Sequence, residues 1–235
     1  MERDPRGGHN RSKINENFFK TWSSSMAYVL GFIYADGAVI DSRISSRTCY
    51  LLLSNNDSDL LYQIRKTLSS DHKLDYRPAT KRNFGKGKTY LCKPSYRLRI
   101  GNKAIYTDLL SYGLIPRKSL TIELPEIPDR YFSFFLRGYF DGDGCVNTGA
   151  RKSGRIIQVI FTSGSFVFLN RLSEKVSDIL RIKPKNTPFQ SGAFRLAFRA
   201  NEAISVCKFM YKDLEISPFL KRKYEIYQEY LASKN

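Results

Sequence analysis

The sequence is poor in the residues that build zinc sites and disulfide frameworks. Its 235 residues include two histidines and four cysteines, and the cysteines are scattered at Cys49, Cys92, Cys145 and Cys207 without a C-x-x-C pair. This spacing excludes a finger-type zinc site and predicts reduced thiols in a cytoplasmic protein. No apolar run approaches the ~18 residues that cross a membrane. Residues 1–17 lack the apolar segment of a secretory signal, so none is expected.

Acidic residues are outnumbered by basic ones. The chain has 22 Asp and Glu against 39 Lys and Arg, a formal net charge of +17. An excess of this size indicates a polyanionic partner, either nucleic acid or an anionic membrane surface. Because no membrane-spanning or targeting segment is evident, nucleic acid is the favoured partner. A basic surface without a particular partner is the alternative.

Two stretches of the chain resemble each other. They are VLGFIYADG at residues 29–37 and LRGYFDGDG at residues 136–144, and each is an apolar helical run that ends in Asp-Gly. Small residues recur every four positions on one face of each helix, at Ala27, Gly31 and Ala35 in the first and at Gly138 and Gly142 in the second. One such stripe is usually a packing feature, but two copies predict two helices whose backbones touch. Asp36 and Asp143 would then lie side by side.

The segments around these stretches repeat as well. Asp143 follows Asp36 by 107 positions, and a similar order of elements follows each. Segments 95–100 and 193–199 alternate apolar and basic side chains, which predicts strands with one buried and one basic face. Further strands are expected over 39–46, 48–53, 74–81, 145–150 and 155–162. The pattern predicts an α+β fold in which helix-strand-strand-helix-strand-strand-helix is used twice.

The two stretches resemble the LAGLIDADG motif of homing endonucleases, with two copies as in the single-chain members of that family. The second copy is the closer match. In the first, Tyr34 stands where the motif has its earlier acid, while the later acid, Asp36, is kept. The resemblance covers most of the chain from about Trp22 and implies two pseudo-symmetric αββαββα halves. Each half would form a saddle-shaped antiparallel sheet, and the halves would join through the two packed motif helices.

This organisation divides the chain into four segments. We expect a flexible basic N-terminal arm over residues 1–21, a first half over 22–118, a linker over 119–129 and a second half over 130–235. The arm is rich in Gly, Arg, Asn and Ser, which suits either contact with phosphate or an ordinary disordered terminus.

The paired aspartates are the candidate metal ligands. A carboxylate at a helix C-terminus meets the negative end of the helix dipole, and two of them repel each other, so a bound divalent cation would compensate. Carboxylate and carbonyl oxygens suit Mg²⁺. The resemblance implies two or three ions held by Asp36 and Asp143 with the carbonyls of Ala35 and Gly142, and Mn²⁺ or Ca²⁺ as substitutes. The alternative is that both aspartates cap turns and bind nothing.

A lysine near the last strand of each half assists the metal site in this family. The resemblance therefore implies a catalytic role for Lys103, beside Asp36 and Asp143. The repeat places Glu202 at the matching position of the second half, so the two DNA strands are expected to be cut at different rates. The alternative is that Lys103 is a solvated residue at a helix start. Asp141, the earlier acid of the second motif, is expected to be structural.

The basic strand faces are the candidate DNA-binding surface, because Arg and Lys contact phosphates and Arg pairs with guanine in the major groove. One half-site is assigned to Arg77, Lys81, Arg97 and Arg99. The other is assigned to Arg155, Gln158, Arg195 and Arg199. The loop over residues 82–88 carries Arg82, Lys86 and Lys88 and is expected to follow the DNA backbone or to reach flanking bases. Since the halves differ in sequence, the target need not be palindromic; ordinary solvated surface is the alternative for each residue.

The leading hypothesis is a monomeric, Mg²⁺-dependent, site-specific double-strand DNA endonuclease of the homing type. The resemblance implies cleavage across the minor groove with short 3′ overhangs, mobility of an intron or intein, and no membrane or obligate protein partner. The expected location is the bacterial nucleoid or an organelle. The alternatives are an RNA-splicing maturase, a DNA-binding regulator that no longer cuts, and a basic structural nucleic-acid protein without a metal.

Overall fold

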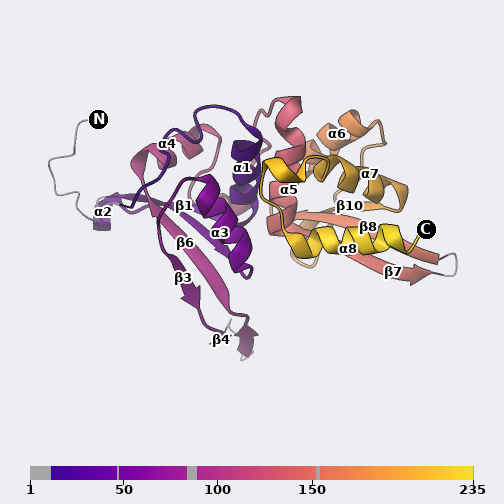
Figure 1. The fold of residues 1–235 in the computed structure, drawn as a ribbon, viewed down its shortest axis with the longest axis horizontal. Helices are drawn as coiled ribbons and strands as arrows, with labels where there is room; N and C mark the ends of the chain where they lie inside the picture. Colours follow the sequence, from indigo (N-terminus) through magenta and orange to yellow (C-terminus); the bar gives the residue numbers. More distant parts are fainter. Residues whose placement is uncertain (1–11, 47, 84–88, 152–153, 235) are drawn as a thin grey trace.

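The computed structural model describes residues 12–46, 48–83, 89–151 and 154–234. Two halves flank a central pair of helices (Figure 1). The pair consists of α1 (Ser24–Asp36) and α5 (Asp129–Asp143), which carry the two repeated stretches. Both helices are buried along most of their length. The contact between them therefore forms the middle of the molecule.

Among the described residues, each half contains one four-stranded antiparallel sheet with helices packed on one face. The first sheet has the order β1-β2-β6-β3 and the second β7-β8-β10-β9. The strands of the first are β1 (Gly37–Asp41), β2 (Cys49–Asn55), β6 (Ser95–Gly101) and β3 (Leu74–Arg77). Those of the second are β7 (Gly144–Arg151), β8 (Gly154–Ser163), β10 (Ala193–Arg199) and β9 (Phe189–Gln190). The predicted α+β fold is confirmed.

Helices cover the inner face of each sheet. The first half uses α3 (Ser58–Thr67) and α4 (Lys103–Ser111). The second half uses α6 (Phe166–Leu180), α7 (Asn201–Met210) and α8 (Lys221–Ala232). Short 3₁₀ turns, η1 (Lys118–Leu120) and η2 (Leu214–Ile216), close the halves. No helix in the described ranges is long and apolar enough to span a membrane.

Polar side chains begin several helices where the sequence offers them. The Ser23 hydroxyl accepts from the Met26 amide at 3.1 Å, and the Asp57 carboxylate accepts from the Leu60 amide at 3.0 Å. Such contacts satisfy amides that have no partner within the first helical turn. The assignment of 22–118, 119–129 and 130–235 to halves and linker stays a prediction.

Two strands differ from the expectation. The expected strand over 39–46 ends at Asp41, and α2 (Arg43–Ser46) follows. The Asp41 carboxylate accepts from the Arg43 amide at 3.1 Å, and this local contact turns the chain. The expected strand over 74–81 is divided into β3 and β4 (Thr80–Asn83) around Pro78, because proline cannot donate to a strand ladder. With β5 (Thr89–Cys92), β4 forms a ribbon that projects from the first half (Figure 1).

The central helices touch through their backbones. A Cβ added to Gly31 would lie 2.1 Å from the carbonyl oxygen of Phe135, and one added to Gly138 would lie 2.0 Å from that of Tyr28. Real Cβ atoms do not approach so closely, so only glycine fits at either position. The predicted backbone contact between the two motif helices is present.

This contact makes a prediction about stability. We expect Gly138→Ala to lower the free energy of unfolding by about 3 kcal/mol, because the helices must move apart to admit a methyl group. Denaturant unfolding of the purified protein measures the change. The matched control is Gly149→Ala, where an added Cβ meets nothing within 4 Å. Equal stability of the two variants would contradict the close contact.

Candidate active site

Asp36 and Asp143 are the last residues of α1 and α5, and the two helix ends meet. A Cβ added to Gly142 would lie 2.4 Å from the Ala35 Cβ and 3.5 Å from the Asp36 Cγ. Asp36 is half-buried; Asp143 is open to solvent on one side, while neighbouring protein atoms crowd its carboxylate. Loss of surrounding water, reinforced by the negative charge of Asp36, raises the pKa of Asp143 to about 6. The two carboxylates therefore act on each other, as the repeat predicted.

The two aspartates are held differently. Asn55, at the end of β2, donates from Nδ2 to the Asp36 carboxylate at 2.7 Å. No described side chain donates to the Asp143 carboxylate; Thr162 donates instead to the Asp143 main-chain oxygen at 2.6 Å. Burial raises the pKa of Asp36, and the Asn55 hydrogen bond opposes that rise. The site is symmetric in its main chain and asymmetric in its side chains.

Two buried lysines reach the same helix ends, and both are 4% exposed. The Lys118 ammonium donates to the Tyr34 carbonyl at 2.8 Å. The Lys223 ammonium donates to the carbonyls of Phe140, Asp141 and Gly144 at 2.5, 3.0 and 2.6 Å. Tyr34 and Asp141 occupy matching positions of the two motifs. Each half therefore places one ammonium group against the C-terminus of its own motif helix, where the helix dipole favours a cation.

Burial lowers the pKa of each of these lysines to about 8. The charges of Asp143 and Asp36 oppose the fall at Lys118, and the charges of Asp141 and Asp36 oppose it at Lys223. An ammonium with such a pKa is still charged near neutral pH and can give up a proton more readily than an ordinary lysine. Both lysines can serve charge stabilisation and proton transfer.

Sequence analysis missed both lysines. Lys103 lies exposed at the start of α4, where its charge acts on the Cys49 thiol. Cys49 begins β2 and Asn55 ends it, so Lys103 is about 20 Å from the aspartates along the strand. The structure thus gives Lys118, and not Lys103, the position beside the pair. The sequence contains a signal for these lysines. A proline ends each half, and a buried lysine follows it within five residues: Lys118 follows Pro116, and Lys223 follows Pro218.

The oxygen atoms around the pair fit a hard divalent cation. The Tyr34 carbonyl accepts from Lys118, and the Asp141 carbonyl accepts from Lys223. By contrast, no described side chain donates to the main-chain carbonyls of Ala35 and Gly142, so these two oxygens are available to a cation. Two carboxylates, two free carbonyls and water form a ligand set that Mg²⁺ prefers. Groups of three or more His, Cys, Asp and Glu suited to a metal are absent from the described residues. The pair at the helix ends is therefore the candidate metal centre.

Tyr34 and Asp141, which occupy the earlier acid position of the two motifs, both fix their helix to another part of the fold. The Asp141 carboxylate accepts from the Tyr28 hydroxyl at 2.8 Å and from the Leu220 amide at 2.9 Å. Tyr34 donates its hydroxyl to the Tyr112 carbonyl. Each side chain thus ties its motif helix to a later segment of the fold, as expected for Asp141.

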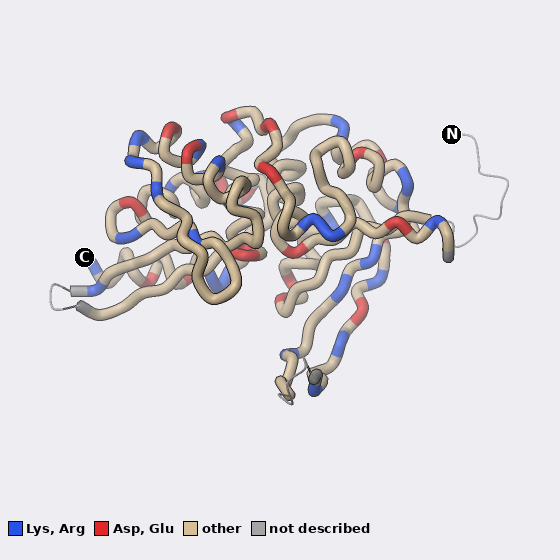
Figure 2. Tube along the Cα trace, turned by 180° about the vertical axis from the view of Figure 1, so that it is seen from behind, with Lys and Arg blue, Asp and Glu red and all other residues tan. Residues whose placement is uncertain are grey.

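Most of the candidate DNA-binding residues lie on the sheet faces that no helix covers. Arg97 and Arg99 alternate with buried Leu98 and Ile100, and Arg77 pairs with Ser95 on the same face. Lys and Arg positions follow the strands that lead into the projecting ribbon, where Lys81 lies exposed (Figure 2). The side chains of Arg82, Lys86 and Lys88 lie outside the described residues.

The second sheet repeats this arrangement with one exception. Arg195 and Arg199 pair with Thr162 and Gln158, and a hollow of about 410 Å³ lies among Gln158, Arg195 and Arg199. Arg155 was assigned to the same surface, and the structure contradicts this. Arg155 is two residues from buried Ile157, so both side chains point to the helix-covered face of the sheet. On that face the Arg155 guanidinium donates to the Thr148 hydroxyl at 3.3 Å. The alternation along β8 carries this signal, because Arg155 and Gln158 are three residues apart and so lie on opposite faces of one strand.

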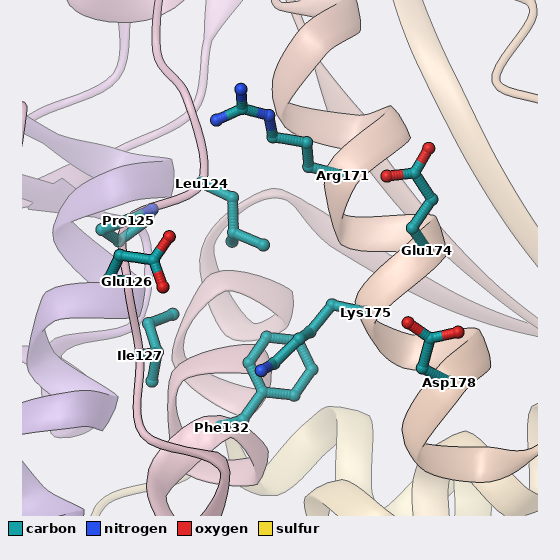
Figure 3. A pocket seen from close by; sticks show the side chains of 9 residues that line it. All are labelled: Leu124, Pro125, Glu126, Ile127, Phe132, Arg171, Glu174, Lys175 and Asp178. Atoms are coloured by element: carbon teal, nitrogen blue, oxygen red, sulfur yellow. The ribbon is translucent and has the colours of Figure 1, made fainter.

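A second hollow lies away from these faces. It has a volume of about 390 Å³ and separates the segment before α5 from α6 (Figure 3). Its walls mix Glu126, Glu174 and Asp178 with Arg171 and Lys175. None of the candidate site residues lines it, so it is separate from the aspartate pair and the basic faces.

Comparison with known proteins agrees with this geometry. Residues 133–182 match a family model described as a LAGLIDADG-like domain, and the described fold carries the second motif helix against the first. This segment of the chain is similar to LAGLIDADG domains. No curated protein sequence matches it.

Solved LAGLIDADG proteins share the fold over most of both chains. The meganuclease I-AabMI bound to uncleaved DNA is 14% identical, with 87% of this chain and 88% of that chain covered at a TM-score of 0.54. Variants of the homing endonuclease I-DmoI are 14% identical, with 91% and 99% covered at 0.56. I-SmaMI bound to cleaved DNA is 14% identical, with 90% and 88% covered at 0.56. At this identity the likeness establishes the LAGLIDADG fold.

The proximity of the aspartates makes a prediction for the metal-free protein. We expect Asp36→Asn to lower the pKa of Asp143 below its value of about 6, because the neighbouring negative charge is removed. Carboxyl ¹³C NMR titration measures the shift. Asp178→Asn, an exposed carboxylate on α6, serves as the control and should leave the Asp143 titration unchanged. An unchanged titration in Asp36→Asn would show that the carboxylates do not interact.

Proposed function

We propose that the protein is a Mg²⁺-dependent, site-specific double-strand DNA endonuclease of the homing type. The observation that carries the proposal is the meeting of Asp36 and Asp143 at one end of the helix contact, with Lys118 and Lys223 beside them. The basic faces of two sheets flank this point. DNA-bound structures of proteins with the same fold support the choice of substrate.

The chain's own groups divide the work of phosphodiester hydrolysis. Asp36 and Asp143, with the carbonyls of Ala35 and Gly142, would hold the cation. When bound, the cation would lower the pKa of water and offset the charge of the phosphate. Lys118 and Lys223 supply positive charge from behind the carboxylates. Each is placed to stabilise the developing charge on one strand or to give a proton to a leaving oxygen. One lysine for each half suits one cut in each strand.

The two sheets would hold the major groove on either side of the cut. Arg97 and Arg99 on one sheet and Arg195 and Arg199 on the other can contact phosphates or pair with guanine. The pair of aspartates would then face the minor groove between them, and cleavage there would leave short 3′ overhangs. Because one chain supplies both halves, the protein would act as a monomer on a non-palindromic site. It would act in the bacterial nucleoid or in an organelle.

A maturase or a regulator that no longer cuts is the second candidate. The endonuclease and the non-cleaving candidate would bind nucleic acid through the same basic faces. The weakening of binding by salt therefore does not distinguish them. The retention of both aspartates together with both buried lysines favours cleavage.

Metal-dependent cleavage tests the proposal. Incubation with a randomised duplex library, with and without Mg²⁺, followed by sequencing of the ends should reveal cutting at one long site. We expect Asp36→Asn and Asp143→Asn to lose cutting while still binding DNA, because each removes a cation ligand. Selective binding without any metal-dependent ends would favour the non-cleaving alternative.

The buried lysine makes a separate prediction. We expect Lys118→Met to reduce the cleavage rate by at least about a hundredfold, since it removes a positioned ammonium group. Lys103→Met, a change of the same kind at the exposed start of α4, should leave the cleavage of both strands nearly unchanged. Rates on the two strands are followed separately with end-labelled duplex. The reverse order of effects would restore Lys103 and remove Lys118 from the site.

A further inference from the structure

The uncovered face of the first sheet is not uniformly basic. Next to the aspartate pair it carries apolar side chains, which alternate along β1 and β2 with the buried residues Val39, Leu51 and Leu53. These apolar residues are Ala38, Ile40 and Leu52. Ala38 is exposed and the other two are half-buried. Three apolar side chains therefore lie on the surface proposed to meet DNA.

The register sets these residues beside a positioned arginine. Ala38 pairs with Leu52, and Leu52 pairs with Arg99. Ile40 pairs with Tyr50, whose ring lies 3.7 Å from the centre of the Arg99 guanidinium. The stacking holds the guanidinium over the sheet. A DNA groove suits this patch. The Arg99 guanidinium beside it can bind a phosphate or a guanine, and the apolar side chains can contact an apolar group of a base from which water is excluded.

The second sheet is alike in one row and different in the next. Cys145 and Ile160 occupy the positions of Ala38 and Leu52 and are apolar as well, so the two sheets differ in the row of Ile40. Asn147 follows Asp143 by four residues, as Ile40 follows Asp36. In its row Asn147 pairs with Gln158, and Gln158 pairs with Arg199. The row that is Ile40, Tyr50 and Gly101 in the first sheet is thus Asn147, Gln158 and Arg199 in the second.

Base edges in the major groove offer a matching contrast. Thymine alone presents a methyl group, which apolar side chains contact, whereas Asn and Gln pair with adenine and Arg pairs with guanine. We propose that the first sheet recognises a thymine methyl group in its half-site through Ile40, whereas the second sheet reads the equivalent position by hydrogen bonds from Asn147, Gln158 and Arg199. This inference rests on the proposed binding of duplex DNA and adds which base chemistry each half selects.

The strand geometry limits where this methyl group lies. Ala38 and Ile40 are two and four residues from Asp36 in the chain, which is about 7 and 13 Å along an extended strand. Successive bases are separated by about 3.4 Å. The thymine that Ile40 contacts should therefore lie about four base pairs from the centre of the site, on one side of it.

Binding to modified DNA tests the inference without any cleavage. A preferred duplex is first selected from a random library in EDTA, and each thymine in it is then replaced in turn by deoxyuridine. This change removes the methyl group and leaves the hydrogen-bonding edge intact. We expect the dissociation constant to rise about fourfold for the methyl group that Ile40 contacts, and not to rise at the equivalent position of the other half-site.

Exchange of the matched residues assigns the half-sites. We expect Ile40→Asn to abolish the deoxyuridine effect at its position and Asn147→Ile to create a preference for thymine at the equivalent position of the other half-site. Thermal unfolding checks that both variants fold. If deoxyuridine is neutral everywhere, or if Ile40→Asn leaves the methyl effect in place, the inference is overturned while the endonuclease proposal stands. If no duplex is preferred at all, the proposed site-specific function fails first.

Discussion

The direct contact between the backbones of α1 and α5 is the constraint on which the rest of the structure depends. Gly31 lies against the Phe135 carbonyl, and Gly138 lies against the Tyr28 carbonyl. Dispersion and the exclusion of water hold such a surface together only where no side chain separates the helices. The contact joins two otherwise separate sheets and brings Asp36 to Asp143. A site shared between two halves therefore follows from the absence of two Cβ atoms.

The charges at this contact balance one another across a short distance. The carboxylates of Asp36 and Asp143 lie at helix ends that already carry partial negative charge. Lys118 and Lys223 donate to main-chain carbonyls at these helix ends. Neither ammonium group would remain buried without these acceptors. The lysines thus help to hold the helix ends together and also place positive charge behind the carboxylates. One set of contacts contributes to both the stability of the fold and the chemistry proposed for it.

The halves are alike in backbone and unlike in surface. Both sheets have the same order and pairing, and Thr162 and Ser54 occupy equivalent rows opposite Arg195 and Arg97. The side chains on the open faces have diverged, with Ile40 on one sheet where Asn147 lies on the other. Repetition of the scaffold preserves the shared centre, while divergence of the faces allows each half to recognise a different sequence.

The sequence by itself determined the repeated α+β plan, the two glycine-lined helices, the pairing of Asp36 with Asp143 and the strand faces of Arg97 and Arg195. These features depend on local periodicity, which neighbouring residues carry. The face of Arg155 also follows from alternation, because Arg155 shares the parity of the buried residues Ile157 and Val159. Tertiary structure alone decided that Lys118 and not Lys103 reaches the aspartates. This depends on how distant segments pack, because η1 folds back onto the end of α1. Spacing along the chain does not encode that distance.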